Sequence, residues 1–340
     1  MISVIIPVYN ITPMILKRCL ESIIEQDYQE WEVIIVNDGS EDFTNEEYKN
    51  CCADNRIRVI YQENKGVSAA RNRGIKEAVG EYMVFVDGDD VIGGHFFEQA
   101  IDLQLKYNAD VIFGKIKYIP EQRPLQGCNE LKFFDEYSLV NVKKALLLVK
   151  QSDIAYPILG SPCGRLYKTE IVKKVLFPEG IAYMEDQIFN REYLNIAKSA
   201  LVVPYIWYVY FQNDFSTMHK FDDKKYFEMS KQFWNRWYIL NMSEQNDEIR
   251  TEMYRQTMQA YYSSIRRWIF PYYGLKKSLK EMNILLNEKY FSGSFKQIKY
   301  REFSGLKDKI GLFLLKNRLL IFIYLYQMYY KSKKGSREVS

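Results

Sequence analysis

The sequence lacks several features that assign a chain to a common class of protein. Its five cysteines, two of them adjacent at Cys51 and Cys52, show neither a metal-site spacing nor a paired disulfide framework, which fits a reducing cytoplasm. The first residues, "MISVIIPVYN", lack the basic start and long apolar core of a signal peptide and predict an opening strand. The 47 lysines and arginines outnumber the 43 aspartates and glutamates by only four, which argues against nucleic acid as a partner.

Two familiar phosphate-binding loops are also missing. No GxGxxG follows the first predicted strand, and no GxxxxGK[ST] occurs anywhere, so neither the dinucleotide nor the P-loop fingerprint applies. A phosphate ligand would therefore be held by a metal ion more than by a glycine-rich loop.

The first part of the chain alternates apolar strands with helical patterns. Strands such as "ISVIIPV" and "WEVIIVN" are apolar on both faces, which predicts an α/β fold with a mostly parallel, Rossmann-like sheet and helices on both faces. From about residue 219 the sequence becomes helical and rich in aromatic residues. With 340 residues the chain is long enough for two domains. We expect an α/β domain over residues 1–218, a helical region over 219–305 and an apolar tail over 306–340.

Four strand ends carry polar strings that should meet at one edge of the sheet, where ligands bind in such folds. They read "PVYN", "NDGS", "ENKG" and "DGDD". Tyr9 is suited to stacking on a base, and Asp38 to accepting a hydrogen bond from the imide N–H of uracil. Lys65 and Arg71 are suited to neutralising phosphate or holding the base. The candidate nucleotide-binding residues are Pro7, Tyr9, Asn10, Asp38, Lys65, Arg71 and Asp87.

The string "DGDD" places two aspartates, Asp87 and Asp89, at the end of a buried strand. Such a pair suits a hard divalent cation, which completes its coordination with water and phosphate oxygens, so a diphosphate ligand is expected. Gly88 allows the backbone to approach a ligand closely. For Asp90 two roles remain open: capping the following helix or supporting the site from behind.

A second carboxylate pair, Glu185 and Asp186, lies far downstream where a loop enters a helix. Neighbouring carboxylates raise one another's pKa, which suits one of them to act as a general base. The alternative is a cluster that only caps the helix N-terminus.

Together these strings resemble family-2 inverting glycosyltransferases of the GT-A fold, over roughly residues 1–215. "SVIIPVYN", "VIIVNDGSED", "NKGVSAARNRGIKEAVGEYMVFVDGDD" and "MEDQIFN" occur in that family's order. The resemblance implies that Tyr9, Asp38 and Arg71 hold the uracil end of a UDP-sugar. It also implies that Asp87 contacts the ribose, while Asp89 ligates Mn²⁺ or Mg²⁺.

The resemblance further implies that Asp186, with Glu185 beside it, is the base for a single inverting displacement. The donated sugar would be a hexose or N-acetylhexosamine, and the acceptor a glycan or lipid-linked oligosaccharide of cell-surface polysaccharide synthesis. The acceptor side falls on Cys163, Arg165 and Tyr167, where many relatives carry tryptophan and lysine instead.

Two histidines are left open. His219 is either a further ligand of the metal or diphosphate, or a polar loop residue. His95 is either structural or part of the wall of the sugar pocket.

Other classes of protein fit less well. A nucleotidyltransferase would need a glycine-rich basic loop after the first strand, and a receiver-type signalling domain would need acidic residues there and about half this length. A relative that binds a partner without catalysis remains open, and a turnover assay would decide it.

The tail "KIGLFLLKNRLLIFIYLYQMYYKSKKG" is the most apolar part of the chain. Spanning a bilayer would put Lys316, Asn317 and Arg318 at its centre, which is costly. Two interpretations remain: a helix in the membrane interface, with basic residues on anionic lipid, or a core helix docked on the preceding helices. The first places the protein in the cytoplasm, at the inner face of the cell membrane.

Overall fold

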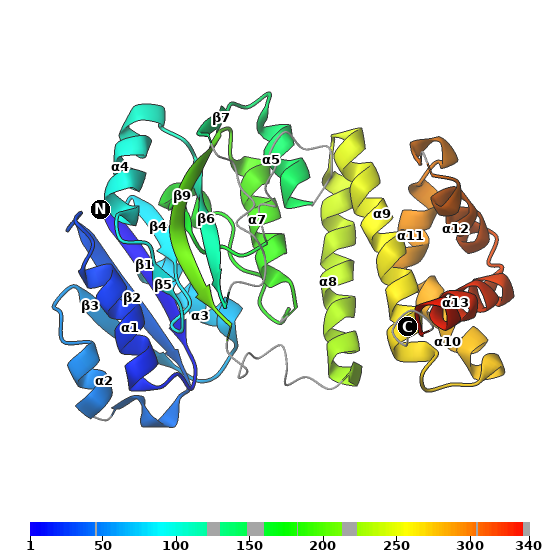
Figure 1. The fold of residues 1–340 in the computed structure, drawn as a ribbon, viewed down its shortest axis with the longest axis horizontal. Coiled ribbons are helices and arrows are strands. Elements are labelled where there is room, and N and C mark those ends of the chain that lie inside the picture. The colour runs from blue at the N-terminus through cyan, green and yellow to red at the C-terminus, as the bar shows by residue number, and fades with distance from the viewer. Residues whose placement is uncertain are drawn as a thin grey trace. The chain divides into compact units, whose positions relative to one another are not determined.

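The computed structural model describes residues 1–44, 46–120, 130–147, 160–181, 183–212, 223–303 and 305–335. The chain divides into two compact units, Met1–Lys220 and Phe221–Ser340. The strands all belong to the first unit, and helices α8 to α13 belong to the second (Figure 1).

One mixed sheet organises the first unit, with nine strands among the described residues. They are β1 (Ile2–Val8), β2 (Trp31–Asp38), β3 (Ile57–Gln62), β4 (Tyr82–Phe85), β5 (Val91–Ile92), β6 (Val111–Ile119), β7 (Lys132–Phe134), β8 (Arg165–Lys168) and β9 (Ala200–Phe211). The order is β3-β2-β1-β4-β8-β6-β9-β5, with β7 beside β9. The strands β1, β2, β3, β4, β6 and β9 run one way and β5, β7 and β8 the other, which confirms a mostly parallel sheet.

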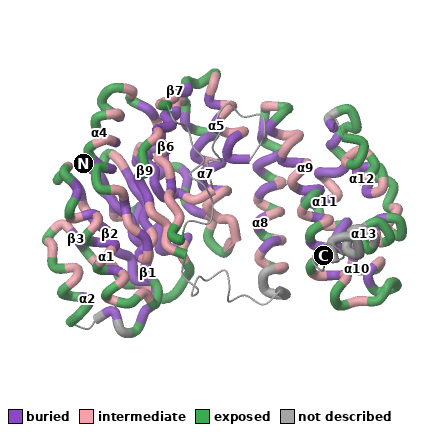
Figure 2. The backbone as a smooth tube through the Cα atoms, viewed as in Figure 1, coloured by how far each residue is buried: buried purple, intermediate pink, exposed green. Residues whose placement is uncertain are grey.

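Helices cover both faces of this sheet, as predicted. They are α1 (Pro13–Ile24), α2 (Glu46–Cys51), α3 (Val67–Glu77), α4 (Phe96–Tyr107), α5 (Leu139–Leu146), α6 (Thr169–Val172) and α7 (Glu185–Ile196). Alternate residues of β1 point to opposite faces: Val4 and Ile6 pack with α1 and α4, while Ile5 packs with α3 and α7. Burial on both faces explains why these strands are apolar throughout (Figure 2).

Local signals fix where the helices near the strand ends begin. Helix α1 starts with Pro13, whose missing N–H is harmless in the first turn. Helix α3 follows Gly66, which has a φ of 87°, a conformation that favours glycine. Helix α7 follows Met184, also left-handed at a φ of 56°, so Glu185 and Asp186 fall in its first turn as predicted.

The second unit is helical, with a core of its own. Its helices are α8 (Asp223–Ser243), α9 (Asp247–Ser264), α10 (Leu275–Asn287), α11 (Lys289–Gln297), α12 (Leu306–Lys316) and α13 (Leu320–Gly335), and a π-helical turn (Ile265–Ile269) follows α9. Tyr261, Phe291 and Phe295 form edge and stacked contacts in that core, so the predicted aromatic helices pack on one another.

The apolar tail is two helices rather than one. Helices α12 and α13 are separated at Arg318, which has a φ of 52°, so the polar residues expected to interrupt the segment break it. Leu312, Leu315 and Ile323 are buried in the core of the second unit, so each helix docks through one face. Among the described residues, no helix combines the length and apolar composition needed to cross a bilayer.

Candidate active site

The polar strings that follow β1, β2, β3 and β4 lie at one edge of the sheet, because these four strands are parallel. The first two strings are joined directly: the backbone N–H of Asn10 donates to Ser40 Oγ at 2.8 Å. Tyr9 beside it is 50 % exposed, so its ring is available to a ligand at this edge. Pro7 lies within β1 and is partly buried.

Asp38, at the end of β2, is 4 % exposed and holds the loop that enters α3. Its Oδ1 accepts from Gln62 Nε2 and from the backbone N–H of Lys65, and its Oδ2 accepts from the N–H of Gly66, each at 2.8 Å. A carboxylate offers about four acceptor positions, so these three bonds leave one for a further donor. The side chain of Lys65 is exposed at the same edge.

Arg71 joins the two predicted carboxylate clusters. This side chain, on α3, is 3 % exposed and lies between Asp87 and Asp186: Nη2 is 2.9 Å from Asp87 Oδ1, and Nη1 is 2.7 Å from Asp186 Oδ1. Glu185 is 3.6 Å from the same Nη1, and the ring of Phe177 lies 5.0 Å from the guanidinium. Burial alone would lower the pKa of Arg71, but the carboxylates raise it, so the guanidinium stays charged.

The environment of Asp186 favours its protonated form. Burial raises its pKa to about 8; Arg71 acts to lower that pKa, while Glu185 and Asp87 raise it. Burial also raises the pKa of Glu185, against the lowering effect of Arg71. A carboxyl group with a pKa in this range suits proton transfer near neutral pH. The pair thus has the property expected of a general base.

Asp90 supports the metal-site candidates from behind, which settles one of its two predicted roles. It is fully buried; its Oδ2 accepts from the Tyr208 hydroxyl at 2.7 Å, and its Oδ1 accepts from the N–H of Phe211 at 2.8 Å. Tyr208 in turn accepts from the N–H of Asp87 at 3.1 Å. Burial and then the Asp87 charge raise the pKa of Asp90 to about 8. The cap of α4 is His95, so the capping role for Asp90 is wrong.

The charges at the end of β4 fit a divalent cation. Asp87, Asp89 and Asp90 lie within four consecutive residues. The guanidinium of Arg71 links the first of them, Asp87, to Glu185 and Asp186. Carboxylate oxygens are hard ligands that suit Mg²⁺ or Mn²⁺. A Cβ at Gly88 would come within 2.8 Å of the terminal methyl of Ile11, so glycine lets this part of the loop pack closely on that side chain. Asp87 and Asp89 therefore fit the metal that the resemblance implies.

The predicted acceptor-side residues are divided by the structure. Strand β8 runs antiparallel to β4 and starts at the same edge, so Cys163 lies beside Asp87, with Sγ 3.8 Å from Asp87 Oδ2. Arg165 is 3 % exposed and contacts the Tyr167 hydroxyl and the Phe113 ring. Tyr167 is 1 % exposed and donates to Asn190 Oδ1 at 2.7 Å, which places it behind the site rather than on its surface.

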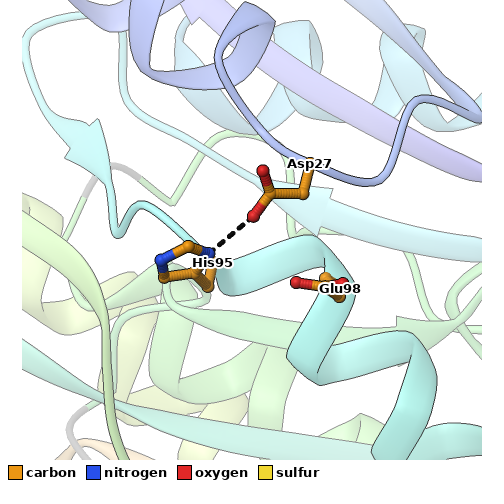
Figure 3. A group of neighbouring side chains, drawn as sticks. All are labelled: Asp27, His95 and Glu98. Atoms are coloured by element: carbon orange, nitrogen blue, oxygen red, sulfur yellow. Dashed lines mark hydrogen bonds and ion pairs between the residues drawn. The ribbon is translucent and has the colours of Figure 1, made fainter.

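His95 lies away from these residues. Its Nδ1 is 2.6 Å from Asp27 Oδ2, and Glu98 lies close by (Figure 3). Among the described residues, this is the one set of at least three histidine, cysteine or carboxylate side chains whose potential ligand atoms all lie within 4.8 Å of one another, and all three are exposed. Asp27 belongs to the connection between α1 and the start of β2, the opposite edge of the sheet from Asp87. His95 is thus structural rather than a wall of the sugar pocket, and His219 lies outside the described residues.

Sequence reasoning missed Tyr208 and Phe177. Tyr208 lies within β9, and its hydroxyl reaches the site only because β9 passes behind the loop after β4. Phe177 precedes α7 and packs flat on Phe189 beneath Arg71. Nothing in the sequence around either residue distinguishes it from an ordinary core aromatic, since only the three-dimensional pairing brings it to the site.

Comparison with known proteins points in the same direction. A model of glycosyl transferase family 2 matches residues 3–175. The glycosyltransferase GlyA of Streptococcus pneumoniae is 32 % identical over 216 residues, which cover 62 % of this chain and 30 % of GlyA. An uncharacterized glycosyltransferase of Bacillus subtilis, EpsJ, is 30 % identical over 63 % of this chain and 61 % of its own length. The chain thus spans less than two thirds of these relatives.

A solved structure resembles the whole chain. The structure of residues 1–349 of S. aureus TarS superimposes with a TM-score of 0.70 and covers 98 % of this chain and 91 % of that fragment, at 20 % identity. The superposition establishes a shared fold, and at 20 % identity it establishes the fold alone. That fold agrees with the GT-A prediction.

Proposed function

This chain belongs to glycosyl transferase family 2, and on that premise we propose that it transfers a sugar from a UDP-sugar to a hydroxyl group of an acceptor, with inversion. The observation that carries the proposal is the Arg71 bridge, because it brings the metal-type carboxylate Asp87 and the base-type carboxylate Asp186 to one guanidinium. Sugar transfer needs both functions side by side: a metal ligand for the donor and a base for the acceptor hydroxyl.

In this proposal the first unit holds the donor. Tyr9 stacks on uracil and Asp38 accepts its imide N–H through the acceptor position that the loop amides do not use. Asn10, Pro7 and Lys65 complete the nucleotide side. Support for UDP comes from the TarS 1–349 structures solved with UDP and with UDP-GlcNAc, which share this fold.

Asp87 and Asp89 are the residues that would hold Mn²⁺ or Mg²⁺, and His219 is a further candidate ligand. Bound there, the ion would offset the negative charge that develops on the leaving diphosphate. Asp87 is kept in place from two sides, by Arg71 on its carboxylate and by Tyr208 on its backbone N–H.

Asp186 takes the proton in the transfer step. Its Oδ1 is fixed by Arg71, so Oδ2 is the oxygen to which we assign the acceptor proton. The acceptor oxygen attacks the anomeric carbon as it loses the proton to Oδ2, and UDP leaves from the opposite face with the bonding electrons. Burial first, and then the Glu185 charge, keep the pKa of Asp186 high enough for this role.

We propose that the donor sugar is a hexose or N-acetylhexosamine. The acceptor would be a glycan or lipid-linked oligosaccharide in cell-surface polysaccharide synthesis; Cys163 and Arg165, 1 % and 3 % exposed, would shape its site from beneath. Under this proposal the protein works in the cytoplasm, at the inner face of the membrane.

The test combines a panel of UDP-sugars with two substitutions. Asp186→Asn should bind UDP in the presence of Mn²⁺ as the unsubstituted protein does, but lose transfer by about 10²- to 10⁴-fold, the usual contribution of a general base. Asp102→Asn, an exposed aspartate on α4, is the matched control and should retain transfer. Equal UDP affinity with and without Mn²⁺, or full transfer by Asp186→Asn, would contradict the proposal.

A further inference from the structure

Helix α12 presents an apolar stripe on the side opposite its docked face. Leu306, Ile310 and Phe313 are spaced by four and three residues, so they share one face, and they are 73 %, 50 % and 50 % exposed. Leu312 and Leu315, on the opposite side, are buried in the core of the second unit. The helix is thus apolar on both faces, although only one of them is covered.

Helix α13 repeats this arrangement on a broader arc. Ile321, Leu325 and Met328 share one face and are 38 %, 55 % and 40 % exposed, and Phe322 extends that face at 56 %. Ile323 is fully buried on the other side. Single exposed apolar residues are ordinary on soluble proteins, but an extended set on consecutive helices marks an interaction surface.

The same part of the chain is strongly basic. Residues 265–335 contain sixteen lysines and arginines against four aspartates and glutamates, a net charge of +12, whereas the whole chain carries only +4. The remainder of the chain is therefore net negative. Lys276, Lys280 and Lys296 on α10 and α11 are exposed, and so are Lys307 and Lys316 on α12. The apolar stripes thus belong to a positively charged unit.

We propose that these side chains form a docking surface for an anionic lipid bilayer, which goes beyond the proposed sugar transfer. The C-terminal apolar face consists of Ile310, Phe313, Ile321, Phe322, Leu325 and Met328. It enters the boundary between headgroups and acyl chains while the surrounding lysines contact anionic headgroups.

Helix length and charge favour this occupant over the alternatives. Helices α12 and α13, of 11 and 16 residues, are roughly 17 and 24 Å long, shorter than the roughly 30 Å apolar core of a bilayer, so they lie along its surface. A second copy would bring two units of the same sign together, which opposes association, whereas anionic lipid supplies the opposite charge. Tyr326, 39 % exposed, is placed for headgroup depth.

The test is flotation of the full chain with vesicles of phosphatidylglycerol and phosphatidylethanolamine, compared with vesicles of phosphatidylcholine. We expect at least about tenfold tighter binding to the anionic vesicles, weakening as salt is raised. The double substitution Phe322→Ser and Leu325→Ser should weaken that binding by about tenfold or more. The matched control replaces Ile239 and Met242 of α8, which are 51 % and 50 % exposed in the same unit, and should leave vesicle binding unchanged.

Three results would overturn the proposal. Equal binding to neutral and anionic vesicles, or equal binding by the Phe322/Leu325 variant, would remove the bilayer as the occupant. A dimer in sedimentation that the same double substitution dissociates would instead assign the face to a second copy. Circular dichroism establishes that the variant is folded, and Mn²⁺-dependent UDP binding by that variant separates failure of this proposal from failure of the proposed transfer.

Discussion

Replacing Arg71 with methionine should destabilise the protein in a way that depends on pH. The substitution keeps an apolar side chain over Phe177 but removes the charge that faces Asp186 at 2.7 Å, Asp87 at 2.9 Å and Glu185 at 3.6 Å. Breaking a buried ion pair by removing one partner costs about 3–5 kcal/mol. Asp87 is 35 % exposed and remains partly hydrated, so we expect the lower end, about 3 kcal/mol at pH 8.

The sign of the pH dependence follows from Asp186. Its folded-state pKa of about 8 lies above its ordinary value of 3.8, so the folded state holds a proton that the unfolded state loses between these values. Stability therefore falls as the pH rises through this window. Removing Arg71, which lowers that pKa, extends the fall to higher pH. At pH 5.5 the Asp186 carboxyl is protonated in the folded state and no longer needs the guanidinium, so the loss should shrink to roughly 1 kcal/mol.

Urea unfolding at pH 5.5 and pH 8.0 measures both values, provided that the dependence on urea concentration is the same for each protein. Arg73→Met is the matched control, because Arg73 lies on the same helix, is 52 % exposed and pairs with Glu77 at 3.2 Å. Its loss should stay below about 0.5 kcal/mol at either pH. Equal losses for Arg71→Met at the two pH values would refute the charge argument.

Four further outcomes are expected. The kcat/KM for transfer should rise with pH through about 8, as the Asp186 carboxyl ionises, and a flat profile would exclude it as the base. Tyr208→Phe leaves the N–H of Asp87 without its acceptor and should lower the free energy of unfolding by about 1–3 kcal/mol in urea melts; no loss would mean that the hydroxyl is dispensable. Asp38→Ala removes the acceptor of two loop amides and should abolish UDP binding in calorimetry; unchanged affinity would show that Asp38 does not belong to the nucleotide site. Removing divalent cations with a chelator should abolish UDP binding, and Mn²⁺ should restore it; binding that survives chelation would argue against Asp89 as a ligand.

Much of the fold could be predicted because its signals are local. The predicted strand "ISVIIPV" is β1 over the same residues, and "WEVIIVN" is β2, which ends one residue later. Strand β8 was missed because four residues are too few to show a period of two, and its place between β4 and β6 depends on pairing rather than on its own sequence.

The site could be predicted only in part. The motifs of Asp38 and Asp87 follow strand ends, so their position near one edge could be predicted from the parallel sheet. The bridge formed by Arg71 could not be predicted. Its side chain, which we assigned to the nucleotide pocket, lies between two carboxylates that are 16 and 115 residues away in the sequence. Desolvation of that guanidinium depends on the whole fold, which no window of sequence contains.

Strand β8 has a consequence for how the protein can change over generations. It is hydrogen-bonded to β4, with Met83 opposite Tyr167, and it begins at the edge where Asp87 lies. A slip of the pairing by one residue would turn the side chain of Arg165 to the opposite face of the sheet. The register therefore fixes which side chains of β8 face the site. The turn before β8 is constrained as well, because Cys163 forms a β-bridge with Phe85 and the carbonyl of Gly164 accepts from the N–H of Gly114. An insertion there would move Cys163 away from Asp87, so we expect this turn to change over generations by substitution rather than in length.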